Sequence, residues 1–182
     1  MAENLFPLNT GKVAWETKKK QKWDVFSYES ASGMRKTLVQ QKYPKWVFDI
    51  SFPALNRREV DMLLSFYARC KGPWLPFFYK DYEIFEVVGR ELAKGIDGSY
   101  QAVIPCDVYE EPALLIDNVR MWVNGERSRD FTVDGGRIQT AVTGNIKFDY
   151  EYYFQVAFAN SIAVSQLFHD IYKVSLSLEV VR

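Results

Sequence analysis

The sequence predicts a mainly β protein, a sandwich or a barrel, with one amphipathic helix packed on the sheet. Hydrophobic residues make up 48% of the 182 residues, enough for a core, and aromatic residues make up 16%. Aromatic side chains favour the half-buried surface of a pleated sheet. Short alternating runs are separated by turn residues at intervals of roughly 8–12 positions, which is typical of sandwiches and barrels.

The N-terminal part is predicted to hold three strands before the helix. Residues 23–28 and 35–41 are extended runs that flank a turn at Ser32-Gly33. The clearest strand follows, because a period of two places four bulky side chains on one face of a sheet. These side chains are Trp46, Phe48, Ile50 and Phe52.

One helix is predicted at about residues 57–71. Asn56 is a favourable N-cap, and Glu59 three positions later completes a capping box. An apolar stripe with helical spacing follows and consists of Val60, Leu63, Leu64, Tyr67 and Cys70. The helix is expected to stop at residues 71–73, where a Gly and a Pro follow a Lys.

Beyond the helix, the chain is predicted to be a series of short strands. Residues 74–88 form one or two strands with a turn near Lys80-Asp81, and residues 89–98 form a loop. Two hairpin turns follow, at Asn124-Gly125 and at Asp134-Gly135-Gly136. Residues 161–169 fit neither pattern clearly. The loop at 89–98 suggests two parts: 1–88 with the helix, and 89–182, a hairpin-rich region that closes the same or an adjoining domain.

The charges of the chain balance, with 23 Lys and Arg against 23 Asp and Glu. A protein that binds a nucleic-acid backbone usually carries surplus positive charge, so no direct nucleic-acid specificity is expected. No apolar run is long enough to span a bilayer, so no membrane insertion is expected. The lysines at 18–20 and 22 are interpreted as a solvated turn or strand edge in preference to an anion-binding patch.

No catalytic, cofactor-binding or metal-binding residue can be assigned from the sequence. His169 is the only histidine, no Ser or Cys has a nucleophile-elbow context, and His169 is expected to be structural or solvent-facing. Glu110-Glu111 precedes a Pro and is interpreted as a loop. Cys70 and Cys106 are too few for a metal cage, and a disulfide between them is left open, although the chain shows no secretory signal. We therefore predict that the chain is not an enzyme.

Five tryptophans and two hairpins supply the candidate interface residues. The tryptophans are Trp15, Trp23, Trp46, Trp74 and Trp122. Trp122 alternates with Met121 and Val123, so it is predicted to face away from the local core, as an interface anchor does. Asn124 and Gly125 belong to the same hairpin, and Arg35 and Lys36 begin a polar strand; these residues complete the set of interface candidates.

Several motifs occur in a particular order along the chain. Ser32-Gly33 and Arg35-Lys36 precede a strand that ends at Phe52, and LLSFYARCKG (63–72) precedes FFYKD (77–81). VRMWVNG (119–125), DFTVD (130–134) and FQVAF (154–158) follow. In this order the motifs resemble the distal tail, or tail-tip hub, protein family of long-tailed phages, prophages and gene transfer agents.

The resemblance implies a tail-tube-like β domain in residues 1–88 and a structural role in the virion tail, with assembly in the host cytoplasm. It implies self-association in a closed ring, taken to be a hexamer, that joins the tail tube to the tail-tip hub and the receptor-binding apparatus. Tail-tube, tape-measure and hub proteins are the implied partners, and no cofactor or enzyme activity is implied. Two alternatives stay open: a carbohydrate-binding module that uses exposed aromatics, and a hydrolase with dispersed carboxylates.

Overall fold

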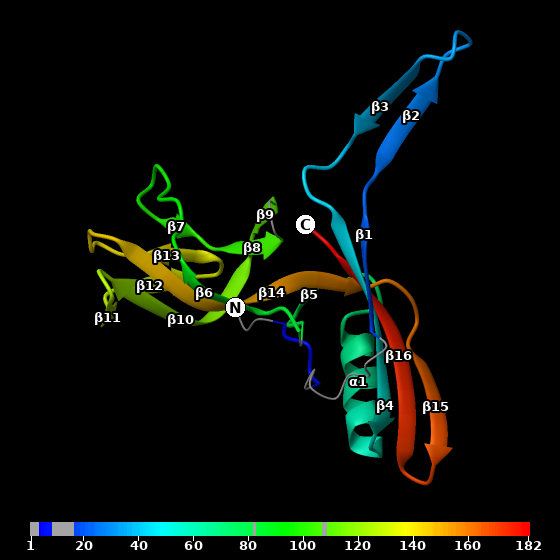
Figure 1. Ribbon diagram of the computed structural model, residues 1–182. Helices are drawn as coiled ribbons and strands as arrows, with labels where there is room; N and C mark the ends of the chain where they lie inside the picture. Colours follow the sequence, from blue (N-terminus) through cyan, green and yellow to red (C-terminus); the bar gives the residue numbers. More distant parts are fainter. Residues whose placement is uncertain (1–3, 9–16, 82, 107–108) are drawn as a thin grey trace. The chain divides into compact units, whose positions relative to one another are not determined.

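The computed structural model describes residues 4–8, 17–81, 83–106 and 109–182. In these ranges the chain is mainly β, with several antiparallel sheets and one helix, α1 (Arg57–Arg69) (Figure 1). The predicted fold class, mainly β with one helix packed on a sheet, is therefore confirmed. With 13 residues, α1 is shorter than the roughly 20 needed to cross a bilayer, and the described ranges hold no other helix that could span one.

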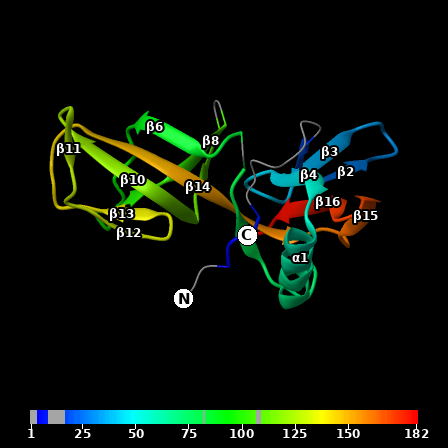
Figure 2. The same ribbon diagram turned by 90° about the horizontal axis from the view of Figure 1, so that it is seen from below.

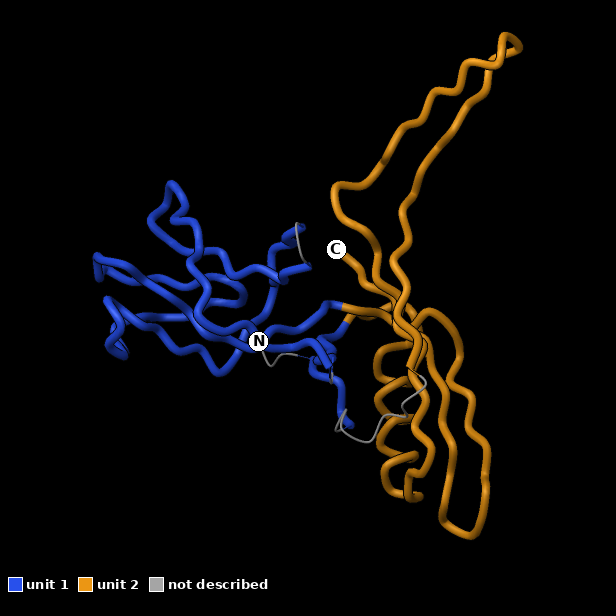
Figure 3. The backbone as a smooth tube through the Cα atoms, viewed as in Figure 1, with its two compact units in different colours: residues 1–11, 77–155 blue, residues 12–76, 156–182 orange. Residues whose placement is uncertain are grey.

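The chain folds as two compact units, each built from two separate segments of the sequence (Figure 3). Unit 1 contains Met1–Gly11 and Phe77–Gln155, and unit 2 contains Lys12–Pro76 and Val156–Arg182. This division differs from the predicted split between residues 88 and 89. The difference arises because long-range strand pairing, which a loop signal at 89–98 does not report, decides which segments fold together.

Unit 2 is an antiparallel sheet with α1 beside it (Figure 1). Its elements, besides α1 and the end of β14 (Ile146–Phe158), are β1 (Lys18–Lys22), β2 (Val25–Glu29), β3 (Arg35–Val39), β4 (Lys45–Leu55), β15 (Ala163–Phe168) and β16 (Ile171–Val180). In the sheet the order is β1-β4-β16, with β14 and β15 both pairing with β16, while β2 and β3 pair with each other as a separate hairpin. Residues 161–169, which the sequence left undecided, thus contain a strand.

The two faces of this sheet differ in polarity. Phe48, Ile50 and Phe52 are buried, and their partners on β16 are Leu178, Leu176 and Val174, as their alternation predicts. On the opposite face, Asp49 accepts hydrogen bonds from Lys20 Nζ at 2.9 Å and Ser177 Oγ at 2.7 Å. The bond from Lys20, followed by that from Ser177, holds the pKa of Asp49 below its usual value. The lysines of β1 lie on a strand that, among the described strands, pairs with β4 alone. On such an edge strand, charged side chains oppose pairing with another chain.

The helix begins as predicted, and Val60, Leu63 and Cys70 of the predicted stripe are buried. The capping box is present, because Asn56 Oδ1 accepts from Glu59 N at 2.9 Å and Glu59 Oε2 accepts from Asn56 N at 3.0 Å. The helix ends at Arg69, two residues before the predicted end. Phe66 is buried, whereas Leu64 is 41% exposed, so the predicted stripe was wrong at this position. Phe66 lies against Phe158 of the sheet, with ring centroids 6.2 Å apart, and this contact rotates the buried face away from Leu64.

Unit 1 contains the remaining strands and the first part of β14. They are β5 (Phe77–Tyr79), β6 (Glu86–Arg90), β7 (Tyr100–Gln101), β8 (Val103–Cys106), β9 (Tyr109–Pro112), β10 (Leu115–Val123), β11 (Glu126–Ser128), β12 (Thr132–Asp134) and β13 (Arg137–Gln139). β14 runs between β6 and β10 (Figure 2), and β12-β13-β7 forms a separate sheet. Glu110 and Glu111, interpreted as a loop, lie in β9, which pairs with β8.

The core of unit 1 lies between these sheets. The rings of Tyr100 on β7 and Phe148 on β14 are 5.2 Å apart, and Met121, Ile138 and Phe148 are fully buried. Tyr150 Oη accepts a hydrogen bond from Val103 N at 3.0 Å and donates one to Val103 O at 2.7 Å, which ties β14 to β8. Burial raises the pKa of Tyr150, so the hydroxyl stays protonated as this double bond requires.

Both predicted hairpin turns of unit 1 are present. Asn124 and Gly125 have φ values of 51° and 91°, and they connect β10 to β11. Gly135-Gly136 connects β12 to β13 and packs against the backbone before β10. A Cβ on Gly136 would lie 1.8 Å from Ala113 O, so only glycine fits there.

Gly136→Ala is expected to destabilise the protein by about 1–3 kcal/mol or more, because the added methyl group meets main-chain atoms that cannot move aside. The measurement is the free energy of unfolding in urea. Gly33→Ala serves as the control: nothing lies within 4 Å of its Cβ position, so it carries only the cost of a positive φ. A smaller loss for Gly136→Ala than for Gly33→Ala would contradict this packing.

Candidate functional site

The predicted interface residues lie on two hairpins, one in each unit. Trp122 is on β10, and Asn124 and Gly125 form the turn after it, so the structure brings these three together in unit 1. Arg35 and Lys36 begin β3 and belong to the hairpin of unit 2. The candidates therefore form two groups, one on each hairpin.

Trp122 has a hydrogen-bonding partner inside unit 1. It lies on the face of β10 opposite the buried Met121, as predicted, yet it is only partly exposed. Its indole Nε1 donates to Asp149 Oδ2 at 2.7 Å, and Asp149 Oδ1 accepts from Gly89 N at 2.7 Å. Trp122 thus satisfies a nearly buried carboxylate, which is a structural task.

The turn after Trp122 is also engaged internally. Asn124 N donates to Asn145 O at 2.9 Å, and Asn124 Oδ1 accepts from Asn145 N at 3.1 Å. These bonds join the β10–β11 turn to the segment that enters β14. Asn124 and Gly125 shape the hairpin, and their contacts lie within unit 1.

The β2–β3 hairpin carries large apolar side chains in solvent. All residues of both strands are exposed. Phe26, Tyr28 and Leu38 are each about 60% exposed, and Met34 in the turn is 62% exposed. An isolated two-stranded hairpin is at best marginally stable in water, and exposed apolar patches commonly mark interaction surfaces. We call this surface, residues 25–29 and 34–39, the exposed hairpin.

The register of the exposed hairpin defines its two faces. Phe26 pairs with Leu38, and Tyr28 pairs with Lys36, so these four side chains share one face. The other face carries two valines, a Ser–Thr pair and the oppositely charged pair Glu29 and Arg35. Each face therefore combines apolar groups with a basic residue, which places the predicted Arg35 and Lys36 on opposite faces of an apolar ribbon.

The exposed hairpin continues the ribbon that β1 and β4 form in the unit 2 sheet (Figure 1). Gln40 N donates to Asp24 O at 3.2 Å, and Gln41 Nε2 donates to Lys22 O at 2.9 Å, between the two paired stretches. These cross-strand bonds connect the hairpin to the edge of the sheet.

A second apolar surface, formed by β15, lies at the edge of the unit 2 sheet away from β1. Among the described strands, β15 pairs only with β16, so its other edge is open, and all six of its residues are exposed. Phe168 is 73% exposed, and Val164 and Leu167 are 38% and 49% exposed. Unlike the lysine-rich β1 edge, β15 carries no charged side chain that would oppose pairing with another chain.

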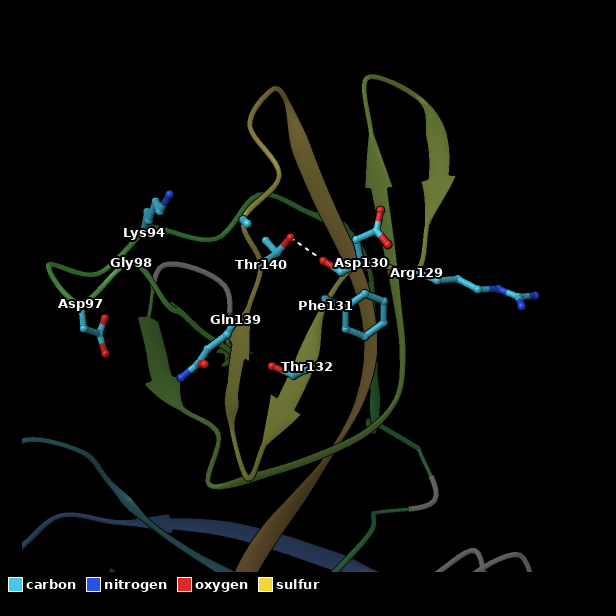
Figure 4. Close-up of a pocket in the computed structure, with 10 residues that line it drawn as sticks. Lys94, Asp97, Gly98, Arg129, Asp130, Phe131, Thr132, Gln139 and Thr140 are labelled. Carbon is cyan, nitrogen blue, oxygen red and sulfur yellow. Dashed lines mark hydrogen bonds between the residues drawn. The ribbon is translucent and has the colours of Figure 1, made fainter.

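Unit 1 contains a depression of about 720 Å³ beside the β12–β13 hairpin (Figure 4). Three segments line it: the loop 94–98, residues 129–132 and residues 139–141. Thr132 and Gln139 are cross-strand partners and lie side by side, with the Phe131 ring next to Thr132 (Figure 4). Thr140 Oγ1 donates to Asp130 O at 2.6 Å, which fixes the two segments at this end.

The Asp97 carboxylate of this depression is held in one orientation. Asp97 accepts from Ser99 Oγ at 2.8 Å and from Ser99 N at 3.1 Å, and Arg137 lies 3.2 Å from its other oxygen. The hydrogen bonds from Ser99, aided by the charge of Arg137, lower the pKa of Asp97. At neutral pH, Asp97 is therefore an ionised hydrogen-bond acceptor.

The remaining chemistry-bearing residues are dispersed. The His169 side chain is 96% exposed, and its Nε2 lies 3.5 Å from Asp170 Oδ2. Of the two predicted roles, structural or solvent-facing, His169 is solvent-facing. Cys70 is buried in unit 2, and Cys106 is half-buried at the end of β8 in unit 1. Within the described ranges, no three His, Cys, Asp or Glu side chains converge on a metal position. Trp23 and Trp74 are exposed and lie on different segments of unit 2, while Trp15 lies outside the described residues.

Sequence reasoning found the basic residues of the exposed hairpin and missed its apolar ones. Phe26, Tyr28 and Leu38 were assigned to ordinary strands, whose apolar residues are normally covered. The available signal was the presence of apolar residues at consecutive positions, Val25-Phe26 and Leu38-Val39, in two short strands joined by a turn. The depression had no signal, because its three segments are far apart in the sequence.

No protein-family model matches this chain, and no curated protein matches it either.

Trp122→Phe is expected to lower the free energy of unfolding by about 1–2 kcal/mol, because it leaves the Asp149 carboxylate short of a donor, and to leave the oligomeric state unchanged. Urea unfolding and light scattering measure the two properties. Trp74→Phe is the matched control, since Trp74 is 77% exposed, and it should change stability little. Loss of assembly at unchanged stability in Trp122→Phe would contradict this expectation and support the predicted role of Trp122 as an interface anchor.

Proposed function

We propose that this protein is a structural component of a virion tail, a distal tail protein that forms a ring between the tail tube and the tail-tip hub with its receptor-binding apparatus. The observation that carries the proposal is the exposed hairpin. Its apolar faces are open to water, and a surface of this kind gains stability when another chain covers it. The order of motifs that resembles the distal tail family supports the tail as the place of assembly.

A ring needs two different surfaces on each copy, because a head-to-tail contact must repeat and close. The exposed hairpin and the β15 edge meet this requirement, since they are separate apolar surfaces of the same unit. Strand addition to an open sheet edge supplies main-chain hydrogen bonds, and the aromatic side chains supply buried area. We assign the exposed hairpin of one copy to the β15 edge of the next.

The chain's charge is compatible with self-assembly. Its formal net charge is +0, so copies experience little mutual repulsion. Flanking contacts with tail-tube, tape-measure and hub proteins belong to the same proposal, and the ring is proposed to be a hexamer. No catalytic step is part of this function.

The double variant Phe26→Glu/Leu38→Glu is expected to abolish assembly, because both charges fall on one face of the exposed hairpin and would be buried in the contact. Light scattering and negative-stain electron microscopy should show a ring with a multiple of 21.2 kDa for the parent protein and a 21.2 kDa monomer for the variant. Ile96→Glu, at a fully exposed loop position of unit 1, is the control and should assemble.

A mixing experiment tests which surfaces meet. Leu167→Glu/Phe168→Glu disables the β15 edge and should also give monomers. Mixed with the hairpin variant, it should form a one-to-one dimer, since the pair retains one intact hairpin and one intact edge. A parent protein that stays monomeric, alone and with tail proteins, would overturn the proposed function; assembly without dimers in the mixture would overturn the assigned contact.

A further inference from the structure

The depression in unit 1 has the composition of a site for a polar ligand with apolar faces. Of its lining side chains, only Phe131 and Ala141 are apolar, and the others carry hydroxyl, amide, carboxylate or cationic groups. The depression has a volume of about 720 Å³ and is shallow and widely open to solvent. The exposed surface of the lining is divided between apolar and polar atoms, so it suits a ligand that presents both C–H groups and hydroxyls.

Hydrogen-bonding groups are available on one face of the β12–β13 hairpin. Thr132 and Gln139 are cross-strand partners, so both side chains stand on the face opposite the buried Ile138. Within the described part of the chain, neither side chain has a hydrogen-bond partner, whereas Thr140 is already bonded to Asp130 O. The amide of Gln139 offers two donors and an acceptor, and the hydroxyl of Thr132 offers one donor and two acceptor positions.

The charges around the depression cancel. Lys94 and Asp130 carry opposite charges, and Asp97 is paired with Arg137 at 3.2 Å. The Arg129 guanidinium points away from the other lining side chains (Figure 4). A strongly charged ligand would meet both signs, so the balance favours a neutral one.

We propose that this depression binds a neutral pyranose unit of an oligosaccharide, a function that goes beyond ring formation. The half-buried ring of Phe131 takes the apolar C–H face of the sugar. Gln139, Thr132 and the ionised Asp97 take its hydroxyl groups. Sugars match this lining because they present C–H groups on their ring faces and hydroxyls at their edges, and aromatic rings with a few polar groups complement both.

The test uses the full chain on a glycan array that carries neutral glucose, galactose and N-acetylglucosamine oligomers beside sialylated and sulfated glycans. Binding to at least one neutral oligomer is expected. Titration with that oligomer should then show that Phe131→Ala and Gln139→Ala each weaken affinity by about tenfold, the factor that corresponds to one lost contact of this kind. Thermal unfolding confirms that both variants are folded, and Gln139, exposed on the surface, carries little risk of misfolding.

Trp74→Ala is the matched control, because Trp74 is an exposed aromatic outside the depression. It should retain the parent affinity. Loss of binding in Trp74→Ala but not in Gln139→Ala would move the sugar site to the tryptophan and overturn the proposal. Absence of neutral glycan binding, or binding of sulfated and sialylated glycans alone that disappears with added salt, would overturn it as well.

Discussion

The 13 consecutive residues of β14, from Ile146 to Phe158, supply the backbone hydrogen bonds on which both compact units depend. In unit 1, β14 pairs with β10 and β6, and in unit 2 its last three residues pair with β16. Its alternate side chains, Phe148, Tyr150, Tyr152 and Phe154, are buried in unit 1, and Phe158 meets the helix in unit 2. A shift of one residue in the register of β14 would move its buried side chains out of the core of either unit, so this strand tolerates little change in its pairing.

The exposed hairpin shows the opposite situation, a pair of strands with no sheet to cover them. Two strands satisfy half of their backbone hydrogen-bonding groups with each other and leave the outer edges open. In the unit 2 sheet, β4 and β16 each have strand partners on both sides, and their inward-facing apolar side chains are buried. The exposed hairpin has the same kind of side chains without such cover, and this contrast is the physical basis for assigning it to contacts between copies.

Residues that looked alike in the sequence divide into structural and surface roles according to their neighbours. Trp122 and Trp74 are both tryptophans near turns, yet only Trp122 has a buried carboxylate to satisfy. Asp149 and Asp97 both accept internal hydrogen bonds, but Asp149 is nearly buried, whereas the Asp97 side chain is 53% exposed at the rim of an open depression. The two surfaces proposed for assembly belong to unit 2 and the proposed sugar site belongs to unit 1, so the two proposed functions draw on separate sets of residues.

The sequence by itself determined the features that depend on near neighbours in the chain: the alternation of β4, the capping box of α1, and the turns at Asn124-Gly125 and Gly135-Gly136. These follow from backbone periodicity and local hydrogen bonds, which act over a few residues. Only the tertiary structure decided that Phe66 is buried in place of Leu64, that residues 156–182 join the N-terminal strands, and that the exposed hairpin has no cover. Burial depends on which distant segment packs against a side chain, and a short window of sequence carries no record of that partner.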